Sequence, residues 1–306
     1  MYDSIYPKKS RPQHYGIVHD NLLASIGDLF GDAITPEVGA GWSQAVKYLA
    51  MILMNREEEL YAEAEQRAGG WRGWKEFVVS ERVSRTKDVV SWSFKRTDGY
   101  SGNFDFTTGQ FLSIKVDAEK LKSETPIAPR HYTITSKPGE DNLQCTVKRI
   151  EGGVVSKWMH DNLMEGDAVM LAPPFGMFTP KPDKKVVLIS AGIGITPMIA
   201  MIKHFSKEEI AKIVHVDRSA DYPFKSFLED CCKDKVSSFV RNGNSVVIDD
   251  VVAAAVENGT EHTFYLCGPP GFMAEMLPAL KQKGCKHVEH EVFGPQLAGL
   301  RCPMRS

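Results

Sequence analysis

The chain has 306 residues, of which 42% are hydrophobic and 25% are charged, a balance that is ordinary for a globular protein. Its net charge of −2 excludes the strong basic field of proteins that bind nucleic acid or anionic membranes. The sequence has no apolar run of the roughly 20 residues that a membrane-spanning helix requires. Its first residues lack the apolar core of a secretion signal, and its six cysteines show no zinc-site spacing. We therefore expect a cytoplasmic protein of about two or three domains, with reduced thiols and no metal.

The first region, residues 1–68, is predicted to be helical. Segments 21–30 and 37–66 carry apolar residues at spacings of three and four, which is typical of helices with one buried face. Gly69 and Gly70 then end the helical pattern.

The second region, residues 69–180, is predicted to form short strands at 77–79, 89–95, 111–116, 131–135 and 143–149, separated by glycine-containing turns. This pattern favours a small antiparallel β-barrel. The third region, 181–306, alternates strands (186–190, 213–216, 262–267, 287–293) with helices (197–205, 224–232, 251–256, 271–282). Such alternation predicts a parallel, doubly wound α/β sheet, so the fold class is multidomain α+β.

Two glycine turns follow strands of the predicted parallel sheet. One contains Gly192, Ile193, Gly194, Ile195, Thr196 and Pro197, and the other contains Cys267, Gly268 and Pro269. Glycine lets a phosphate approach the backbone at the start of a helix, and ligands bind at the carboxyl edge of such sheets. Taken singly, the first is equally a tight turn, and a buried core thiol is the commoner role for a residue such as Cys267.

The barrel carries two further candidate segments. The strand Arg130, His131, Tyr132, Thr133, preceded by Phe111, offers a guanidinium for phosphate and a ring for stacking, although an ordinary barrel strand also fits. Gly153, Val154, Val155 and Ser156 open a helix, which suits a phosphate or a simple serine cap. At the end of the last strand lie Glu291, Val292, Phe293, Gly294 and Pro295, which alone indicate no more than a strand end.

In this order, Arg-x-Tyr-Thr, Gly-Gly-x-x-Ser, Gly-Ile-Gly-Ile-Thr-Pro-Met, Tyr-Leu-Cys-Gly-Pro and Glu-x-Phe-Gly-Pro resemble the ferredoxin–NADP reductase-like layout. The chain is similar in particular to flavohaemoglobins, also called nitric oxide dioxygenases. Segment 68–77 resembles their globin-to-reductase junction, and segment 12–23 resembles the part that follows their haem-ligating histidine.

The resemblance implies an FAD-dependent oxidoreductase in which nicotinamide C4 gives hydride to flavin N5. Phe111, Arg130, His131, Tyr132 and Thr133 would line FAD, and Gly153, Val154, Val155 and Ser156 would hold its phosphates. The turn from Gly192 to Pro197 would bind the pyrophosphate of NAD(P)H, with Cys267, Gly268 and Pro269 near the nicotinamide. Val292, Phe293, Gly294 and Pro295 would cover the flavin, and Thr133, Cys267 and Glu291 would act in catalysis. Arg218 and Ser219 would meet a 2′-phosphate or form a solvated loop, which leaves NADH and NADPH both open.

One departure from the family concerns haem. Ungapped alignment on His14 and Tyr15 puts Ile5 where the haem-ligating histidine belongs, so we expect a truncated globin region without haem. The first hypothesis is a haem-free flavin reductase that passes electrons to a small molecule or a haem protein. The second is a nitric oxide dioxygenase completed by a globin from elsewhere, and the third is a non-enzymatic remnant that binds a partner. Helices that have lost their globin core are expected to expose apolar surface and to self-associate.

Overall fold

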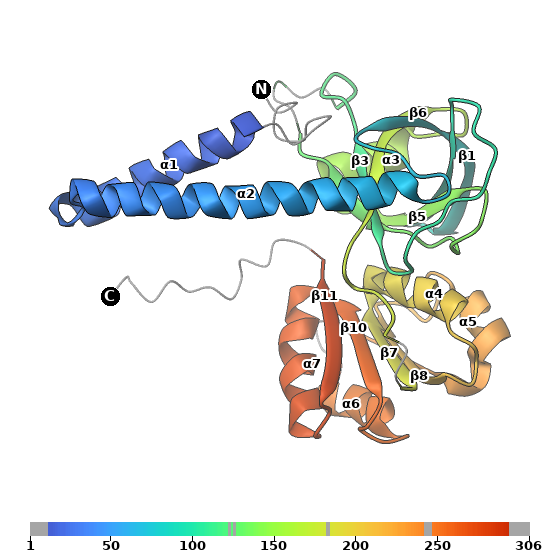
Figure 1. Ribbon diagram of the computed structural model, residues 1–306. Helices are drawn as coiled ribbons and strands as arrows, with labels where there is room; N and C mark the ends of the chain where they lie inside the picture. The colour runs from blue at the N-terminus through green and yellow to red at the C-terminus, as the bar shows by residue number, and fades with distance from the viewer. Residues whose placement is uncertain (1–11, 122–123, 125–126, 182–183, 242–246, 294–306) are drawn as a thin grey trace.

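The computed structural model describes residues 12–121, 124, 127–181, 184–241 and 247–293. Figure 1 shows a long helical hairpin, an antiparallel sheet that curls into a barrel, and a parallel sheet covered by helices. The predicted multidomain α+β fold class is confirmed, whereas the boundaries at 68/69 and 180/181 remain predictions. No helix in the described part of the chain has both the length and the apolar character needed to cross a membrane.

The hairpin consists of α1 (Pro12–Phe30) and α2 (Pro36–Gln66), joined by a short turn at Gly31–Ala33. Thr35 caps α2 by accepting a hydrogen bond from the Val38 amide at 3.3 Å, and Pro36 suits the first helical position. α1 begins nine residues before the predicted start at residue 21. Two polar contacts join the helices: the Tyr15 hydroxyl donates to Glu57 at 3.0 Å, and the His19 ring lies 2.9 Å from Ser43 Oγ.

The antiparallel sheet contains β1 (Lys75–Thr86), β2 (Val89–Arg96), β3 (Phe111–Lys115), β4 (Arg130–Thr133), β5 (Leu143–Lys148) and β6 (Ala168–Phe175). Its order is β4-β3-β6-β1-β2-β5, and a bridge between Ile134 and Cys145 joins the two ends into a barrel. Trp92, Phe77 and Phe94 are fully buried inside it. α3 (Val154–Asn162) covers one opening and contributes Met159 to the same core.

The parallel sheet has the order β11-β10-β7-β8-β9. Its strands are β7 (Val186–Ala191), β8 (Ile210–Asp217), β9 (Val236–Val240), β10 (Thr263–Gly268) and β11 (His287–Val292). α4 (Ile195–His204) and α5 (Lys225–Cys232) pack on one face, and α6 (Ile248–Val256) and α7 (Pro270–Gln282) pack on the other. The doubly wound arrangement is therefore confirmed. β6 and β9 are strands that the sequence pattern did not predict.

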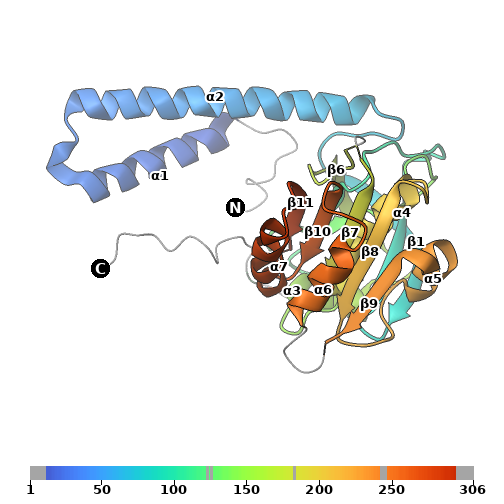
Figure 2. The same ribbon diagram turned by 90° about the horizontal axis from the view of Figure 1, so that it is seen from below.

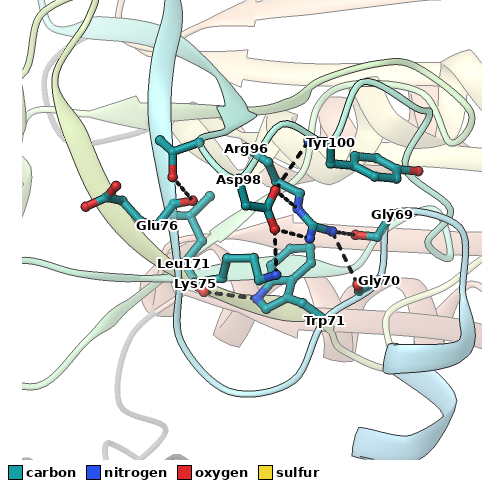
Figure 3. Close-up of polar contacts among 10 residues, drawn as sticks. Gly69, Gly70, Trp71, Lys75, Glu76, Arg96, Asp98, Tyr100 and Leu171 are labelled. Carbon is teal, nitrogen blue, oxygen red and sulfur yellow. Dashed lines mark hydrogen bonds and ion pairs between the residues drawn. The ribbon is translucent and has the colours of Figure 1, made fainter.

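The hairpin joins the barrel through a compact polar junction, which Figure 3 shows. The Arg96 guanidinium donates to the carbonyl oxygens of Gly69 and Gly70 at 3.3 and 3.4 Å and pairs with Asp98. Hydrogen bonds from Arg96, and then from Lys75, lower the pKa of Asp98. A Cβ atom at Gly70 would lie 2.0 Å from the Ala64 carbonyl oxygen, so only glycine permits this sharp exit from α2.

The barrel and the parallel sheet also contact each other directly. The Lys203 ammonium on α4 donates to the Thr135 carbonyl oxygen at 2.5 Å. The rings of Phe178 and Tyr265 meet edge to face at 5.7 Å, and Arg85 lies over the ring of Phe224 at 4.9 Å. These contacts come from several elements on each side, so the barrel faces the sheet over a defined surface.

Candidate functional site

The two glycine turns of the parallel sheet contact each other. Gly192 has a φ of +53°, in the left-handed region that favours glycine. A Cβ atom at Gly194 would lie 2.4 Å from the Cys267 carbonyl oxygen, so glycine is required for the two turns to approach. Both turns follow the carboxyl ends of neighbouring strands, β7 and β10. The structure therefore brings these two motifs to one edge, where ligands bind in sheets of this kind.

Most side chains of the first turn face the protein interior, whereas Ile193 is half-buried. Ile195 and Thr196 are each 1% exposed, and the Thr196 hydroxyl donates to the Ile193 carbonyl oxygen at 3.0 Å. Pro197 is buried beside them in the first turn of α4. Gly194, the N-cap of this helix, supplies no side-chain cap. What the turn offers to a ligand is therefore its backbone N–H groups, which favour an anion.

Cys267 and Glu291 lie side by side at the carboxyl ends of β10 and β11, where they are register partners. Cys267 is fully buried, and burial together with the neighbouring Glu291 raises its pKa well above the usual range. Burial also raises the pKa of Glu291. Gly268 lets the backbone pass Phe272, and Pro269 caps α7. The pair thus presents a neutral thiol beside a carboxyl group whose ionised form is disfavoured.

The predicted flavin residues of the barrel lie on β3 and β4. Arg130 is exposed, and its guanidinium donates to the Ala128 carbonyl oxygen at 2.7 Å, two residues earlier in the chain. Tyr132 is half-buried, and burial raises the pKa of its hydroxyl, which therefore remains a hydrogen-bond donor. Thr133 is 4% exposed. His131 contacts Ser113 Oγ at 2.8 Å and the Phe111 ring at a centroid distance of 4.6 Å.

The glycine-opened helix α3 begins as predicted. Gly153 is its N-cap and supplies no side-chain cap. The Ser156 hydroxyl accepts a hydrogen bond from the Ile150 amide at 3.3 Å and therefore does not cap the helix. Val155 is buried in the barrel core, whereas Val154 is exposed. The first N–H groups of α3 therefore have no side-chain cap, as at an anion-binding helix start.

Phe178 connects the barrel end of the site with the sheet end. A Cβ atom at Gly109, just before β3, would lie 2.0 Å from the Phe178 carbonyl oxygen. The Phe178 ring belongs to the same apolar cluster as Tyr265 and Cys267, and Phe293 packs against that cluster. The Phe111 end of the barrel therefore lies against the sheet face that holds Cys267. Val292 packs on the opposite face, and Gly294 and Pro295 lie outside the described residues.

A polar group at the end of β8 was missed by sequence reasoning. The Ser190 hydroxyl lies 2.8 Å from His215 Nδ1, and His215 Nε2 lies 3.4 Å from an Asp217 carboxylate oxygen. Arg218 and Ser219, which were predicted, are exposed beyond this group, and Ser219 Oγ accepts from the Asp221 amide. An acidic residue about 20 residues after the glycine turn is the signal that would have revealed Asp217.

A cavity of about 490 Å³ opens at the opposite edge of the parallel sheet, where β7, β8 and β10 begin. Its lining includes Lys185, Lys235 and His262 and contains none of the predicted site residues. Among the described residues, no group of three or more His, Cys, Asp or Glu side chains could hold a metal ion.

The residues of the barrel fit a flavin dinucleotide, and those at the carboxyl edge of the parallel sheet fit a nicotinamide dinucleotide. Each needs a diphosphate site, and α3 and α4 each have a glycine as N-cap residue and no side-chain cap. A bound flavin ring also needs an aromatic side chain to stack on and a hydrogen-bond donor beside it. The ring and the hydroxyl of Tyr132 supply these two features. The fit thus rests on the backbone N–H groups at the two helix starts and on Tyr132 of β4.

Comparison with known proteins agrees with this geometry. Residues 76–179 match the model of the oxidoreductase FAD-binding domain family. The flavohemoprotein of Bacillus subtilis is 33% identical over 310 residues, which cover 94% of this chain and 76% of the relative. Flavohemoprotein A of Dictyostelium discoideum is 31% identical over 304 residues, covering 93% and 76%.

Solved structures give the same assignment. The flavohemoglobin of Malassezia yamatoensis, determined with bound FAD and heme, superposes with a TM-score of 0.75 at 26% identity, covering 93% of this chain and 76% of that one. The FAD/NAD-binding domain of nitric oxide dioxygenase from Vibrio cholerae gives a TM-score of 0.61 at 26% identity, covering 72% and 99%. The chain belongs to the flavohemoprotein family and is an FAD-dependent oxidoreductase that uses NAD(P)H.

Proposed function

We propose that the chain is a NADH:acceptor reductase that binds FAD on β3, β4 and α3 and NADH at the carboxyl edge of the parallel sheet. The observation that carries this proposal is the contact between the Gly194 and Cys267 turns, on the sheet face that Phe178 links to the barrel. When bound, NADH supplies a hydride and FAD accepts it. The chain supplies binding and orientation, because the cofactors carry the chemistry.

Each barrel residue has a distinct proposed task. The exposed Arg130 guanidinium suits an FAD phosphate, which it can hold through two N–H groups at once. The uncapped start of α3 at Gly153 suits the same diphosphate. Tyr132 presents its ring to the flavin and its protonated hydroxyl to a polar flavin or ribose atom. Thr133 and His131 shape the adjoining wall.

Cys267 and Glu291 are proposed to position the nicotinamide. Cys267 stays a neutral thiol, so it offers a small, uncharged surface against which a ring can lie. Glu291 stands beside it at the end of β11 and can accept a hydrogen bond from a carboxamide group. Phe293 would cover the flavin ring from the same strand end. None of these groups needs to move a proton.

The preference for NADH is proposed from Asp217. Burial raises the pKa of this carboxyl group, but the nearby His215 ring and the Arg218 amide outweigh that effect and hold the pKa below its usual value. An ionised carboxylate at the end of the second strand accepts hydrogen bonds from a ribose diol and repels a 2′-phosphate. Arg218 is the competing residue, because its exposed guanidinium would favour the 2′-phosphate.

The test is steady-state reduction of ferricyanide by the FAD-loaded protein with NADH and with NADPH. We expect kcat/KM to favour NADH at least about tenfold, the ratio that 1.4 kcal/mol of discrimination gives. Asp217→Asn should reduce that preference, mainly through KM, whereas Asp221→Asn in the same loop should not. A wild-type preference for NADPH would contradict the role of Asp217. Absence of flavin reduction by either nucleotide would contradict the reductase itself.

We further propose that the reductase works without haem and passes electrons to a small-molecule acceptor or a separate haem protein. In the hairpin, His19 is the histidine whose side chain the structure describes, and both of its ring nitrogens are engaged, by Asp20 and Ser43. Absorption spectra after addition of FAD and hemin test this: a flavin spectrum without a Soret shift is expected, and a stoichiometric Soret band would contradict it. The five free thiols in the described residues are in keeping with the cytoplasm, which we propose as its location.

A further inference from the structure

α2 carries an uncovered apolar seam. Val38, Trp42, Leu49 and Ile52 are 42–54% exposed, and with Ala45 they repeat at alternating spacings of four and three. That spacing keeps side chains on one line of a helix and is the pattern by which helices pack against other helices. The seam lies in the half of α2 that is far from the barrel (Figure 2).

α1 carries a second seam of the same kind. Val18, Leu22 and Leu29 are 59%, 41% and 68% exposed, and Ser25 completes the same spacing. In both helices a seam residue directly precedes a residue that faces the other helix: Val18 precedes His19, and Trp42 precedes Ser43. Viewed from the N-terminus of each helix, the seam is therefore displaced from the inward face by a rotation in the same direction. Because the helices are antiparallel, both seams lie on the same side of the hairpin.

This two-helix face has the size of a protein interface. Val18, Leu22, Leu29, Val38, Trp42, Leu49 and Ile52, together with Leu53, form what we name the hairpin face. With about half of each side chain exposed, the eight offer roughly 600 Å² of apolar surface, which is at the upper end of the largest apolar patches on typical monomers. Each partner of a standard interface contributes about 800 Å², so the apolar surface of the hairpin face alone amounts to roughly three quarters of one partner's share.

The chemistry of the hairpin face favours a second copy of the chain. A two-fold interface must be complementary to itself, and an uncharged apolar stripe meets that condition. No charged residue interrupts the seam between Val38 and Ile52, and Arg56, at the next position of the repeat, pairs with Glu59 on its own helix. We propose that two copies join their hairpin faces as a four-helix bundle about a two-fold axis.

The experiment is sedimentation velocity on the FAD-loaded full chain over a range of micromolar concentrations. The wild type is expected to sediment at twice the 34.1 kDa of one chain. Ile52→Glu, which puts a charge on the hairpin face, should weaken association at least about a hundredfold. Its matched control is Met51→Glu, because Met51 is also 46% exposed but points away from the hairpin face. That variant should remain a dimer.

Unchanged circular dichroism and NADH–ferricyanide activity show that each variant is folded, and Leu49→Glu repeats the test at a second seam position. A monomeric wild type at tens of micromolar overturns the proposal, as does dissociation by Met51→Glu equal to that by Ile52→Glu. A monomer in which residues 1–11 are protected from proteases would mean that this segment covers the hairpin face. That result would also overturn the dimer proposal. A monomer that gains a Soret band with hemin would assign the hairpin face to a haem pocket, with the same consequence.

Discussion

The helical hairpin and the parallel sheet use apolar residues in opposite ways. All six residues of β10 are buried, whereas α2, which the structure describes in full, buries Val46 and Ala64 among its 31 residues. The sheet is enclosed by helices on both faces, so every apolar side chain of its central strands gains from the hydrophobic effect. The hairpin leaves comparable side chains in water. The parallel sheet thus encloses its own apolar side chains, whereas the hairpin leaves an apolar face exposed.

The largest effect should come from truncating one leucine in each region. Leu188→Ala, at a fully buried position of β7, should lower the free energy of unfolding by about 2–5 kcal/mol because it leaves a cavity. Leu49→Ala, at 54% exposure, should change it by less than about 0.5 kcal/mol in dilute protein. Urea denaturation followed by circular dichroism measures both. Equal losses at submicromolar concentration would erase the contrast between the regions.

Replacing a glycine by alanine should lower reductase turnover in the parallel sheet but not in the hairpin. Gly194→Ala places a carbon against the Cys267 carbonyl oxygen and should cut NADH–ferricyanide turnover on the order of a hundredfold, since a displacement near 1 Å has that cost. Gly41→Ala on α2 meets no atom within 4 Å and should leave turnover unchanged. Normal turnover in Gly194→Ala would show that the two turns do not form the nicotinamide site.

Glu291 should show a smaller effect that depends on pH. Its folded pKa is raised by burial, so the ionised form destabilises the native state, and that loss appears as pH rises from the unfolded pKa through the folded one. Glu291→Gln should therefore melt higher than wild type at neutral pH, with the gain vanishing at acid pH. Its reductase rate should fall by up to about tenfold, because the Gln carbonyl oxygen accepts a weaker hydrogen bond from the carboxamide than a carboxylate does. Glu289→Gln, which breaks only a surface pair with Lys181, is the control, and a melting gain that persists at acid pH contradicts the assignment.

The smallest effect should lie at the junction that joins the hairpin to the barrel. Arg96→Ala removes hydrogen bonds to the Gly69 and Gly70 carbonyl oxygens and the pair with Asp98, and it should cost about 1 kcal/mol of stability. Protease cleavage between the hairpin and β1 should become faster, while NADH–ferricyanide turnover stays normal. Lys95→Ala, which loses an exposed pair with Asp141, should change neither property. Reduced turnover in Arg96→Ala would mean that the hairpin anchor also supports the site.

Sequence patterns predicted the fold where a single local signal, such as an apolar run followed by a glycine turn, defines the element. The central strands of the parallel sheet are apolar runs between glycine turns, and both glycine motifs are found at the predicted edge. β6 was missed because Pro173 and Pro174 argue against a strand. In the structure they fall between Ala172 and Phe175, where the pairing with β3 slips and no ladder hydrogen bond is needed from them.

The other two omissions, β9 and Asp217, occur where the local sequence pattern carries no signal. β9 is a half-exposed edge strand containing Ser237 and Ser238, so neither apolar content nor alternation marks it. Asp217 was missed because the apolar run ends at Val216, one residue earlier. Its significance comes from His215 beneath it and Ser190 on the neighbouring strand, a contact that depends on strand order. The proposed cofactor roles of the individual site residues remain predictions.

The length of α2 sets the reach of the molecule. Thirty-one residues at a helical rise of 1.5 Å span about 46 Å, and the residues from Val38 to Ile52 occupy the distal half of that span. The proposed contact between two copies therefore lies at the end of α2 that is remote from the barrel (Figure 2). In the proposed dimer the hairpin would act as a spacer that keeps the contact between the two copies apart from the barrel of each copy.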